Sequence, residues 1–338
     1  MTGKLPTFDE LPHYKDFAGC AWGVWGKEDQ LGTVNILTED VVKRATTEEI
    51  KTGKTVSLNW PVNFPEGPLF KRKTPEITQK ELGGLSVCRD DEININTQSG
   101  SQWDGMKHFG IFDGMVYYNG VKGSDLPSGP LHIPDPQHID PKLKLLGVQN
   151  WAEHGICGRG VLLDLVRFYT EGGKPLPYDP WTAHPIPLAD LEACAKKQGV
   201  TFREGDILLL RVGFIKKWNE SSLEALDALS KREETFAGIE QSEDMKRFLW
   251  YVPYIANNHF AAIASDQPSL ERWPTPEGVP HLHQTILGLW GMPLGEMFDL
   301  EKLSDECAKA KRWTFFFSSW PLNIIGGVAS PPNAAAYF

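Results

Sequence analysis

Residues 96–110 read NTQSGSQWDGMKHFG, and the fold and function of the chain are best inferred from this stretch outward. Side chains alternate between the two faces of an extended strand, so Gln98, Gln102 and Asp104 would share one face. An Asp-Gly turn signal follows, and an i, i+4 spacing would bring His108 to the same side as Asp104. The stretch therefore predicts two amides, a carboxylate and an imidazole at one point, as a catalytic or metal site requires.

A solvated hairpin leading into residues 109–118 is the alternative interpretation of the same stretch. Glutamine and asparagine are common in turns and edge strands, and no pair of histidines marks a metal site here. Spacing alone leaves both interpretations open.

Composition limits the class of protein. The chain has 338 residues, of which 41% are hydrophobic, so one large domain over residues 1–338 has enough apolar material for its core. The net charge of -10 argues against nucleic acid as a partner. The sequence contains no run of 18 apolar residues, no apolar core of a signal peptide and no CxxC pair among its five cysteines. We therefore expect a cytoplasmic protein with no membrane partner, disulfide framework or zinc knuckle.

Helical and strand-like patterns alternate along the chain, which predicts a mixed α/β fold behind an irregular N-terminal segment, residues 1–37. Helices are expected at residues 38–52, 187–199, 222–232, 243–251, 281–289 and 300–309. Strands are expected at residues 56–62, 161–163, 207–212, 260–264 and 313–317. Two long loops are expected at residues 63–90 and 121–148, and a hairpin at residues 109–118.

The central stretch resembles the signature His-x-Gly-Thr-His-x-Asp-x-x-x-His of the cyclase family, which includes bacterial kynurenine formamidases and isatin hydrolases. On this chain the signature falls on Gln98, Gly100, Ser101, Gln102, Asp104 and His108. The glycine, the aspartate and the last histidine match, and serine replaces the threonine. Both leading histidines, which bind the metal in the formamidases, are glutamine here.

Further segments resemble the family in the same order, at residues 25–35, 155–164, 205–213 and 265–269. The resemblance implies the swivelling β/β/α fold of that family. It also implies a homo-oligomer, a dimer or tetramer, in which neighbouring chains can help to build a site.

A histidine and a glutamate near the C-terminus complete the metal site of the formamidases. The resemblance gives these roles to His283 and Glu296, with His281 as the competitor for the histidine. Amide oxygens are neutral, hard ligands, so exchanging two imidazoles for amides should weaken zinc binding. Asp104, His283 and Glu296, with the amide oxygens of Gln98 and Gln102 as helpers, form an oxygen-rich set that would suit Mn or Mg better than Zn. A site without metal is the open alternative, and no organic cofactor is expected.

Three further side chains are candidates for substrate binding: Trp103, His154 and His259. Both of these histidines precede predicted buried strands, and functional side chains of α/β proteins gather at strand ends. A high aromatic content also fits a pocket for a flat ligand, although a dense core with large interfaces is the default explanation.

As the family resemblance implies, we expect a hydrolase of a carbon–nitrogen bond in a small, aromatic amide or lactam. His108 would be the general acid/base, because the unperturbed pKa of histidine lies near neutrality. Asp104 and Glu296 would hold a metal or orient water, and Gln98 and Gln102 would orient water or stabilise oxyanion charge. The alternatives are a metal-independent cyclase, dehydratase or lactone-forming enzyme, and a ligand-binding pseudoenzyme.

Overall fold

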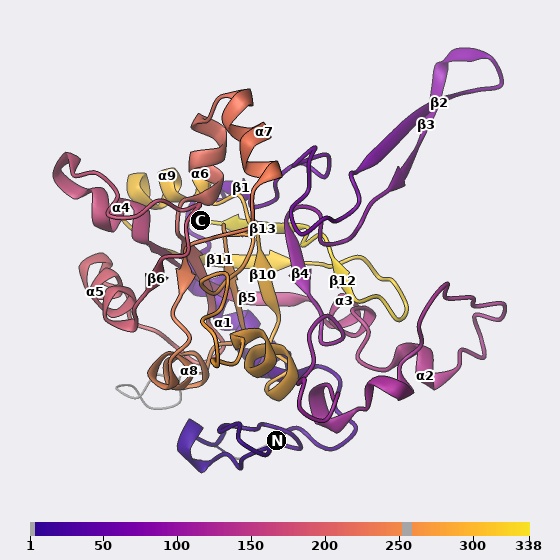
Figure 1. Cartoon of the computed structure of the whole chain (residues 1–338), viewed down its shortest axis with the longest axis horizontal. Coiled ribbons are helices and arrows are strands. Elements are labelled where there is room, and N and C mark those ends of the chain that lie inside the picture. The colour runs from indigo at the N-terminus through magenta and orange to yellow at the C-terminus, as the bar shows by residue number, and fades with distance from the viewer. Residues whose placement is uncertain (1–3, 252–258) are drawn as a thin grey trace.

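The fold is built on a nine-stranded sheet with four parallel strands at its centre (Figure 1). The strand order is β1-β13-β11-β5-β7-β9-β10-β4-β12. Strands β5, β7, β9 and β10 pair in parallel, whereas the pairs towards both edges are antiparallel. The computed structural model describes residues 4–251 and 259–338.

The main-sheet strands are β1 (Thr55–Ser57), β4 (Gln102–Asp104), β5 (Ile156–Asp164), β7 (Ile207–Arg211), β9 (Ala262–Ser265), β10 (Leu294–Glu296), β11 (Thr314–Ser319), β12 (Ala329–Ser330) and β13 (Ala334–Tyr337). Two small sheets pair β2 (Glu76–Leu82) with β3 (Leu85–Asn94), and β6 (Pro185–Ile186) with β8 (Gly238–Ile239). The helices are α1 (Glu39–Glu49), α2 (Pro141–Lys144), α3 (Gln149–His154), α4 (Leu165–Thr170), α5 (Leu188–Gln198), α6 (Phe214–Glu220), α7 (Leu223–Lys231), α8 (Glu243–Trp250), the π-helix η6 (Gln284–Leu289) and α9 (Glu301–Ala310).

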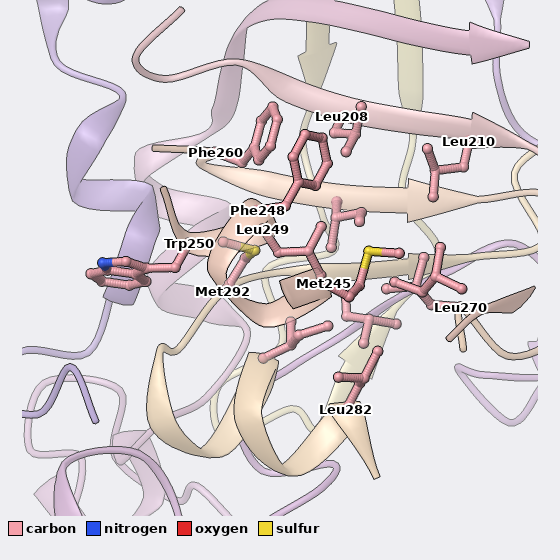
Figure 2. Close-up of a cluster of buried hydrophobic side chains, with 14 of the residues drawn as sticks. Leu208, Leu210, Met245, Phe248, Leu249, Trp250, Phe260, Leu270, Leu282 and Met292 are labelled. Atoms are coloured by element: carbon pink, nitrogen blue, oxygen red, sulfur yellow. The ribbon is translucent and has the colours of Figure 1, made fainter. Parts of the chain in front are cut away.

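The central strands are apolar on both faces because helices and loops cover both. On one face, Leu208 and Leu210 of β7 pack with Met245, Phe248 and Leu249 of α8 (Figure 2). On the other face, Ile207 and Leu209 of β7 cluster with side chains of α3 and α9. A continuous apolar run is the pattern expected for such doubly covered parallel strands.

The mixed α/β fold predicted from the sequence is confirmed. The helices predicted near residues 38–52, 187–199, 222–232, 243–251 and 300–309 correspond to α1, α5, α7, α8 and α9. The strands predicted near residues 161–163, 207–212, 260–264 and 313–317 correspond to β5, β7, β9 and β11. Thr38 caps α1 as expected, because its hydroxyl accepts a hydrogen bond from the Val41 amide.

The prediction of one long loop at residues 63–90 is wrong. Residues 76–94 instead form the two-stranded hairpin β2–β3, which projects from the body of the protein (Figure 1). Charged residues stand on both faces of these strands, so the alternation of polar and apolar residues that predicts a half-buried strand is weak.

Three predicted extended segments are shorter in the structure. The strand predicted at 56–62 is reduced to β1, and the hairpin at 109–118 to a bridge between Ile111 and Val116. Only residues 102–104 of the central stretch form a strand, because residues 98–101 turn before it. Residues 284–289 form a π-helix where an α-helix is the simpler expectation.

Residues 4–37 contain short 3-10 helices and otherwise irregular backbone. The segment nevertheless contributes to the core: Phe8 and Leu11 are buried, and the Trp22 indole donates to the Gly288 carbonyl at 2.8 Å. Among the described residues, none of the helices combines the length and the apolar character needed to cross a bilayer.

Candidate active site

The centre of the candidate site lies where β4 and β10 pair. The antiparallel register sets Gln102 opposite Glu296 and Asp104 opposite Leu294. Side chains two residues apart on a strand share a face, so Gln102, Asp104 and Glu296 point to the same side of the sheet. All three are almost completely buried.

The two motif glutamines direct their amide nitrogens at these carboxylates. Nε2 of Gln98 donates to Oδ1 of Asp104 at 2.6 Å. Nε2 of Gln102 donates to the same oxygen at 3.2 Å and to Oε2 of Glu296 at 2.7 Å. The amides therefore hold the outer oxygens of both carboxylates, while Oδ2 of Asp104 and Oε1 of Glu296 remain on the side facing His283.

His283 is the histidine that the structure brings to this cluster. Its Nδ1 lies 2.6 Å from Oε1 of Glu271, and its Nε2 lies 3.2 Å from Oε1 of Glu296. Burial alone would lower the pKa of His283, but its hydrogen bonds to Glu271 and Glu296 outweigh this effect and raise the pKa to about 10. His281 instead stacks on Trp273. The structure thus separates two histidines that the sequence left as alternatives.

His108 stands next to the cluster without closing a hydrogen bond to it. Its Nε2 is 3.7 Å from Oδ2 of Asp104, beyond hydrogen-bond distance. Burial is the main cause that lowers the pKa of His108, and the charge of Asp104 opposes this effect only in part. The imidazole is therefore neutral near pH 7 and able to accept a proton.

The three acidic and imidazole groups fit one divalent cation. Ligand atoms from Asp104, His283 and Glu296 all lie within 4.8 Å of one another. Among the described residues, the buried Oδ2 of Asp104 has no hydrogen-bond partner, which a bound cation would satisfy. Glu271 behind His283 is the usual carboxylate support of a metal-binding imidazole.

A cavity of about 170 Å³ opens beside this cluster. It is lined by Phe70, Arg72, His108, Phe109, Pro268, Ser269, Trp273, His283 and Glu296. A dry cavity of about 150 Å³ is enough to hold benzene, so this volume suits a ligand with one aromatic ring. Rings from Phe70, Phe109 and Trp273 supply apolar walls for it.

The three residues predicted to bind substrate, Trp103, His154 and His259, do not line this cavity. Trp103 points to the opposite face of β4, where it packs on Phe298 and donates from its indole to the Ser319 hydroxyl at 2.8 Å. His154 borders a separate surface hollow, and His259 packs against the Trp250 ring. Trp103 lies on the face opposite the site because side chains alternate along a strand, so it points away from its neighbours Gln102 and Asp104.

Three functional candidates were missed from the sequence. Arg72 reaches the site from the segment before β2, and its Nη1 donates to the Gln98 carbonyl at 2.7 Å. Glu271 supports His283, and the buried Ser269 hydroxyl lines the cavity without a hydrogen-bond partner among the described residues. The Asp-Gln-Pro-Ser-Leu-Glu sequence after β9 was the available signal for Ser269 and Glu271, because strand ends gather functional side chains.

Comparisons with known proteins agree on the family and the fold. The Cyclase family model, described as "Putative cyclase", matches residues 55–272. A solved structure of a novel cyclase is 30% identical, covers 94% of this chain and 99% of its own, and has a TM-score of 0.76. An isatin hydrolase bound to the product analogue thioisatinate is 13% identical over 87% of this chain and 94% of its own, with a TM-score of 0.54. Isatin hydrolase A from Labrenzia aggregata, bound to benzyl benzoate, is 14% identical over 90% and 98%, with a TM-score of 0.51. A search of curated proteins gave no match.

The mixed sheet and its topology define a protein with the fold shared by cyclases and isatin hydrolases. The chain belongs to the Cyclase family, because the family model matches more than half of it and the novel cyclase is 30% identical over nearly its whole length. The family resemblance inferred from residues 98–108 is thereby confirmed.

Proposed function

We propose that this protein hydrolyses a carbon–nitrogen bond in a small aromatic amide or lactam. The observation that carries the proposal is the cavity in which the neutral imidazole of His108 faces the buried pair Asp104 and Glu296, beside aromatic walls. The fold shared with isatin hydrolases supports a reaction of this kind.

Asp104, His283 and Glu296 would hold a divalent cation of the Mn, Mg or Zn class in this proposal. When bound, such an ion polarises a carbonyl and lowers the pKa of a water molecule. Gln98 and Gln102 keep Asp104 and Glu296 in place through the oxygens that point away from His283.

His108 would act as the general base and then as the general acid. The imidazole takes one proton from the attacking water as the carbon–oxygen bond forms. It then gives that proton to the amine nitrogen as the carbon–nitrogen bond breaks. One water is consumed, and a carboxylate, an amine and one proton released to solvent are produced.

The walls of the cavity would orient the substrate. Phe109 and Trp273 offer ring faces to an aryl group. The Ser269 hydroxyl, which has no partner within residues 4–251 and 259–338, can donate to a substrate oxygen. Arg72 carries a positive charge into the cavity, with Nη1 engaged and further guanidinium donors available for an acyl or carboxylate oxygen.

A specific observation favours a second candidate, a metal-independent cyclase or dehydratase. Nε2 of Gln102 bridges Asp104 and Glu296, and His283 lies within hydrogen-bond distance of Glu296, so protein donors already compensate part of the negative charge. Acid/base chemistry by His108 and Asp104 would then suffice.

A screen of purified protein against aryl formamides, anilides and lactams tests the proposal. Each substrate is offered to chelated protein and to protein reloaded with Mn²⁺, Mg²⁺ or Zn²⁺. Hydrolysis of at least one aromatic amide, lost on chelation and restored by a single ion, is the expected result. Turnover without added water in the product, unchanged by chelation, would favour the second candidate. Absence of any hydrolysis across the panel with every ion would contradict the proposal.

A further inference from the structure

Arg72 differs from most arginines of this chain in the partners of its charge. Most described arginines form an ion pair with a carboxylate: Arg89, Arg159, Arg167, Arg203, Arg211, Arg247 and Arg312. Among the described residues, Arg72 donates only to amide oxygens. Arg44, Arg232 and Arg272 also lack a carboxylate partner there, but they do not line the cavity of the candidate site, as Arg72 does.

The segment before Arg72 is fixed to the body of the protein. Phe70 and Lys71 both have left-handed backbone, with φ of 57° and 53°, which is uncommon for residues other than glycine. The Phe70 amide donates to Oε1 of Glu234 at 3.1 Å, and the Phe70 ring packs edge-on against Trp273. Such backbone persists only where surrounding contacts hold it, and it clusters at ligand sites. The turn therefore delivers Arg72 to the cavity in a defined place.

Only one side of the guanidinium is engaged by the described residues. Nη1 of Arg72 donates to the Gln98 carbonyl at 2.7 Å and lies 3.5 Å from Oε1 of Gln102. Cζ lies 5.1 Å from the centre of the Phe70 ring, a cation–π distance. Nε and Nη2 have no hydrogen-bond partner within residues 4–251 and 259–338. These two nitrogens carry parallel N–H groups, which bind a carboxylate in the bidentate mode.

A counter-ion for Asp104 and Glu296 is the alternative role of Arg72. The two motif glutamines and His283 already bond to these carboxylates. An ion pair needs a nitrogen within about 4 Å of a carboxylate oxygen. In the described part of the chain, the partners of Asp104 and Glu296 at this distance are histidines, not Arg72. The charge of Arg72 is therefore left for a group that enters the cavity.

We propose that Arg72 binds a carboxylate of the substrate, so that the substrate class is an aromatic amide with an anionic group next to the amide on its ring. This inference rests on the proposed amide hydrolysis and narrows its substrate. Arg72 and His108 line the same cavity of about 170 Å³, which suits one aromatic ring. One ring with two neighbouring substituents can present its amide to His108 and its carboxylate to Arg72.

Binding of benzoate and benzamide tests the anion site without any turnover. The two probes share one ring and a similar shape, and only benzoate is charged near pH 7. Calorimetry is performed on the chelated full chain, so that no metal binds the carboxylate. Because a hydrogen bond to a charged group contributes more than one to a neutral group, we expect benzoate to bind at least about tenfold more tightly than benzamide.

Variants of Arg72 assign this preference to its side chain. Arg72→Gln should bind both probes equally, and Arg72→Lys, which keeps the charge and loses the planar fork, should retain only part of the preference. The matched control Lys73→Gln removes the positive charge of the exposed neighbour and should keep the wild-type preference. Circular dichroism reports whether each variant remains folded. Equal binding of both probes by the wild type, an unchanged preference in Arg72→Gln, or its equal loss in the control would overturn the proposal.

Two substrates separate this inference from the proposed function. The compound ortho-formamidobenzoate carries a carboxylate next to its amide, and its methyl ester is the neutral counterpart. We expect wild-type kcat/KM to favour the carboxylate at least about tenfold, and Arg72→Gln to raise KM more for the carboxylate than for the ester. Amide hydrolysis of both at equal kcat/KM would retain the proposed function and overturn the role of Arg72. Hydrolysis of neither, with the benzoate preference intact, would support the anion site and count against the proposed function.

Discussion

Gln102 and Glu296 lie directly opposite each other on antiparallel strands, and the amide nitrogen of Gln102 donates to Oε2 of Glu296 at 2.7 Å. The glutamine that replaces a family histidine thus acts here as a hydrogen-bond donor to a carboxylate. A neutral imidazole at this position would offer a nitrogen lone pair to a metal, which the amide nitrogen cannot do. The substitution therefore changes how the site compensates its negative charge.

Restoring the two imidazoles should strengthen zinc binding. In Gln98→His/Gln102→His, two nitrogen ligands join Asp104, and zinc prefers such ligands. We expect zinc affinity, measured by competition with a chromogenic chelator, to rise at least about tenfold, the size typical of changes around a metal site. The surface variant Gln137→His serves as the control, and equal affinities in both variants would argue against this account of the glutamines.

Removal of His108 should abolish turnover and spare the fold. His108→Ala deletes the group assigned to proton transfer, a contribution typically worth about 10²–10⁴ in rate. The side chain is 21% exposed and already lines the cavity, so its loss enlarges that cavity and removes no hydrogen bond to the cluster. The rate is measured on the substrate found in the screen, with the exposed His132→Ala as control. Wild-type kcat in His108→Ala would refute the assignment.

Glu271 should contribute to metal affinity and to kcat although its side chain does not line the cavity. In Glu271→Gln the carboxylate that holds Nδ1 of His283 is lost, and support of this kind is commonly worth about 10–100-fold in metal affinity or activity. Metal affinity by calorimetry and kcat should both fall by this factor. The exposed Glu277→Gln is the control. Unchanged affinity and kcat in Glu271→Gln would mean that His283 needs no such support.

His259 should make the protein sensitive to acid. Burial lowers the pKa of His259 from 6.5 to about 4, so the unfolded chain binds its proton more readily than the folded one. The stability linked to this residue is complete above pH 6.5 and is lost as the pH falls towards about 4. Urea unfolding across this range should show a shallower pH dependence in His259→Asn than in the wild type or in His138→Asn. Parallel curves for all three proteins would contradict the prediction.

Sequence reasoning reached the centre of the site because short-range geometry and a family signature coincide there. Strand spacing accounts for Gln102 and Asp104, whereas Gln98 reaches them from a turn and not from the predicted strand; the resemblance added Glu296 from 192 residues beyond Asp104. The structure brings all four within one hydrogen-bonded cluster. Periodicity also predicted the central strands, since their doubly buried faces leave continuous apolar runs.

The residues that were missed depend on contacts that no local pattern encodes. Arg72 was hidden because residues 63–90 are rich in proline and charge, which suggested a loop. In the hairpin β2–β3 of that region, apolar residues lie near both ends of β3 and Arg89 lies between them. The alternation of apolar and polar residues is therefore interrupted. Glu271 supports the site only through its hydrogen bond to His283, which lies twelve residues later in the sequence. The tertiary fold brings these two side chains into contact.

Isotope labelling tests the central claim, that this site adds water across a carbon–nitrogen bond, most directly. The substrate is converted in water enriched in oxygen-18, and the product is analysed by mass spectrometry. We predict that the wild type places one labelled oxygen in the new carboxylate and that His108→Ala forms no labelled product. A product without label, or labelled product formed at the wild-type rate by His108→Ala, would contradict the account.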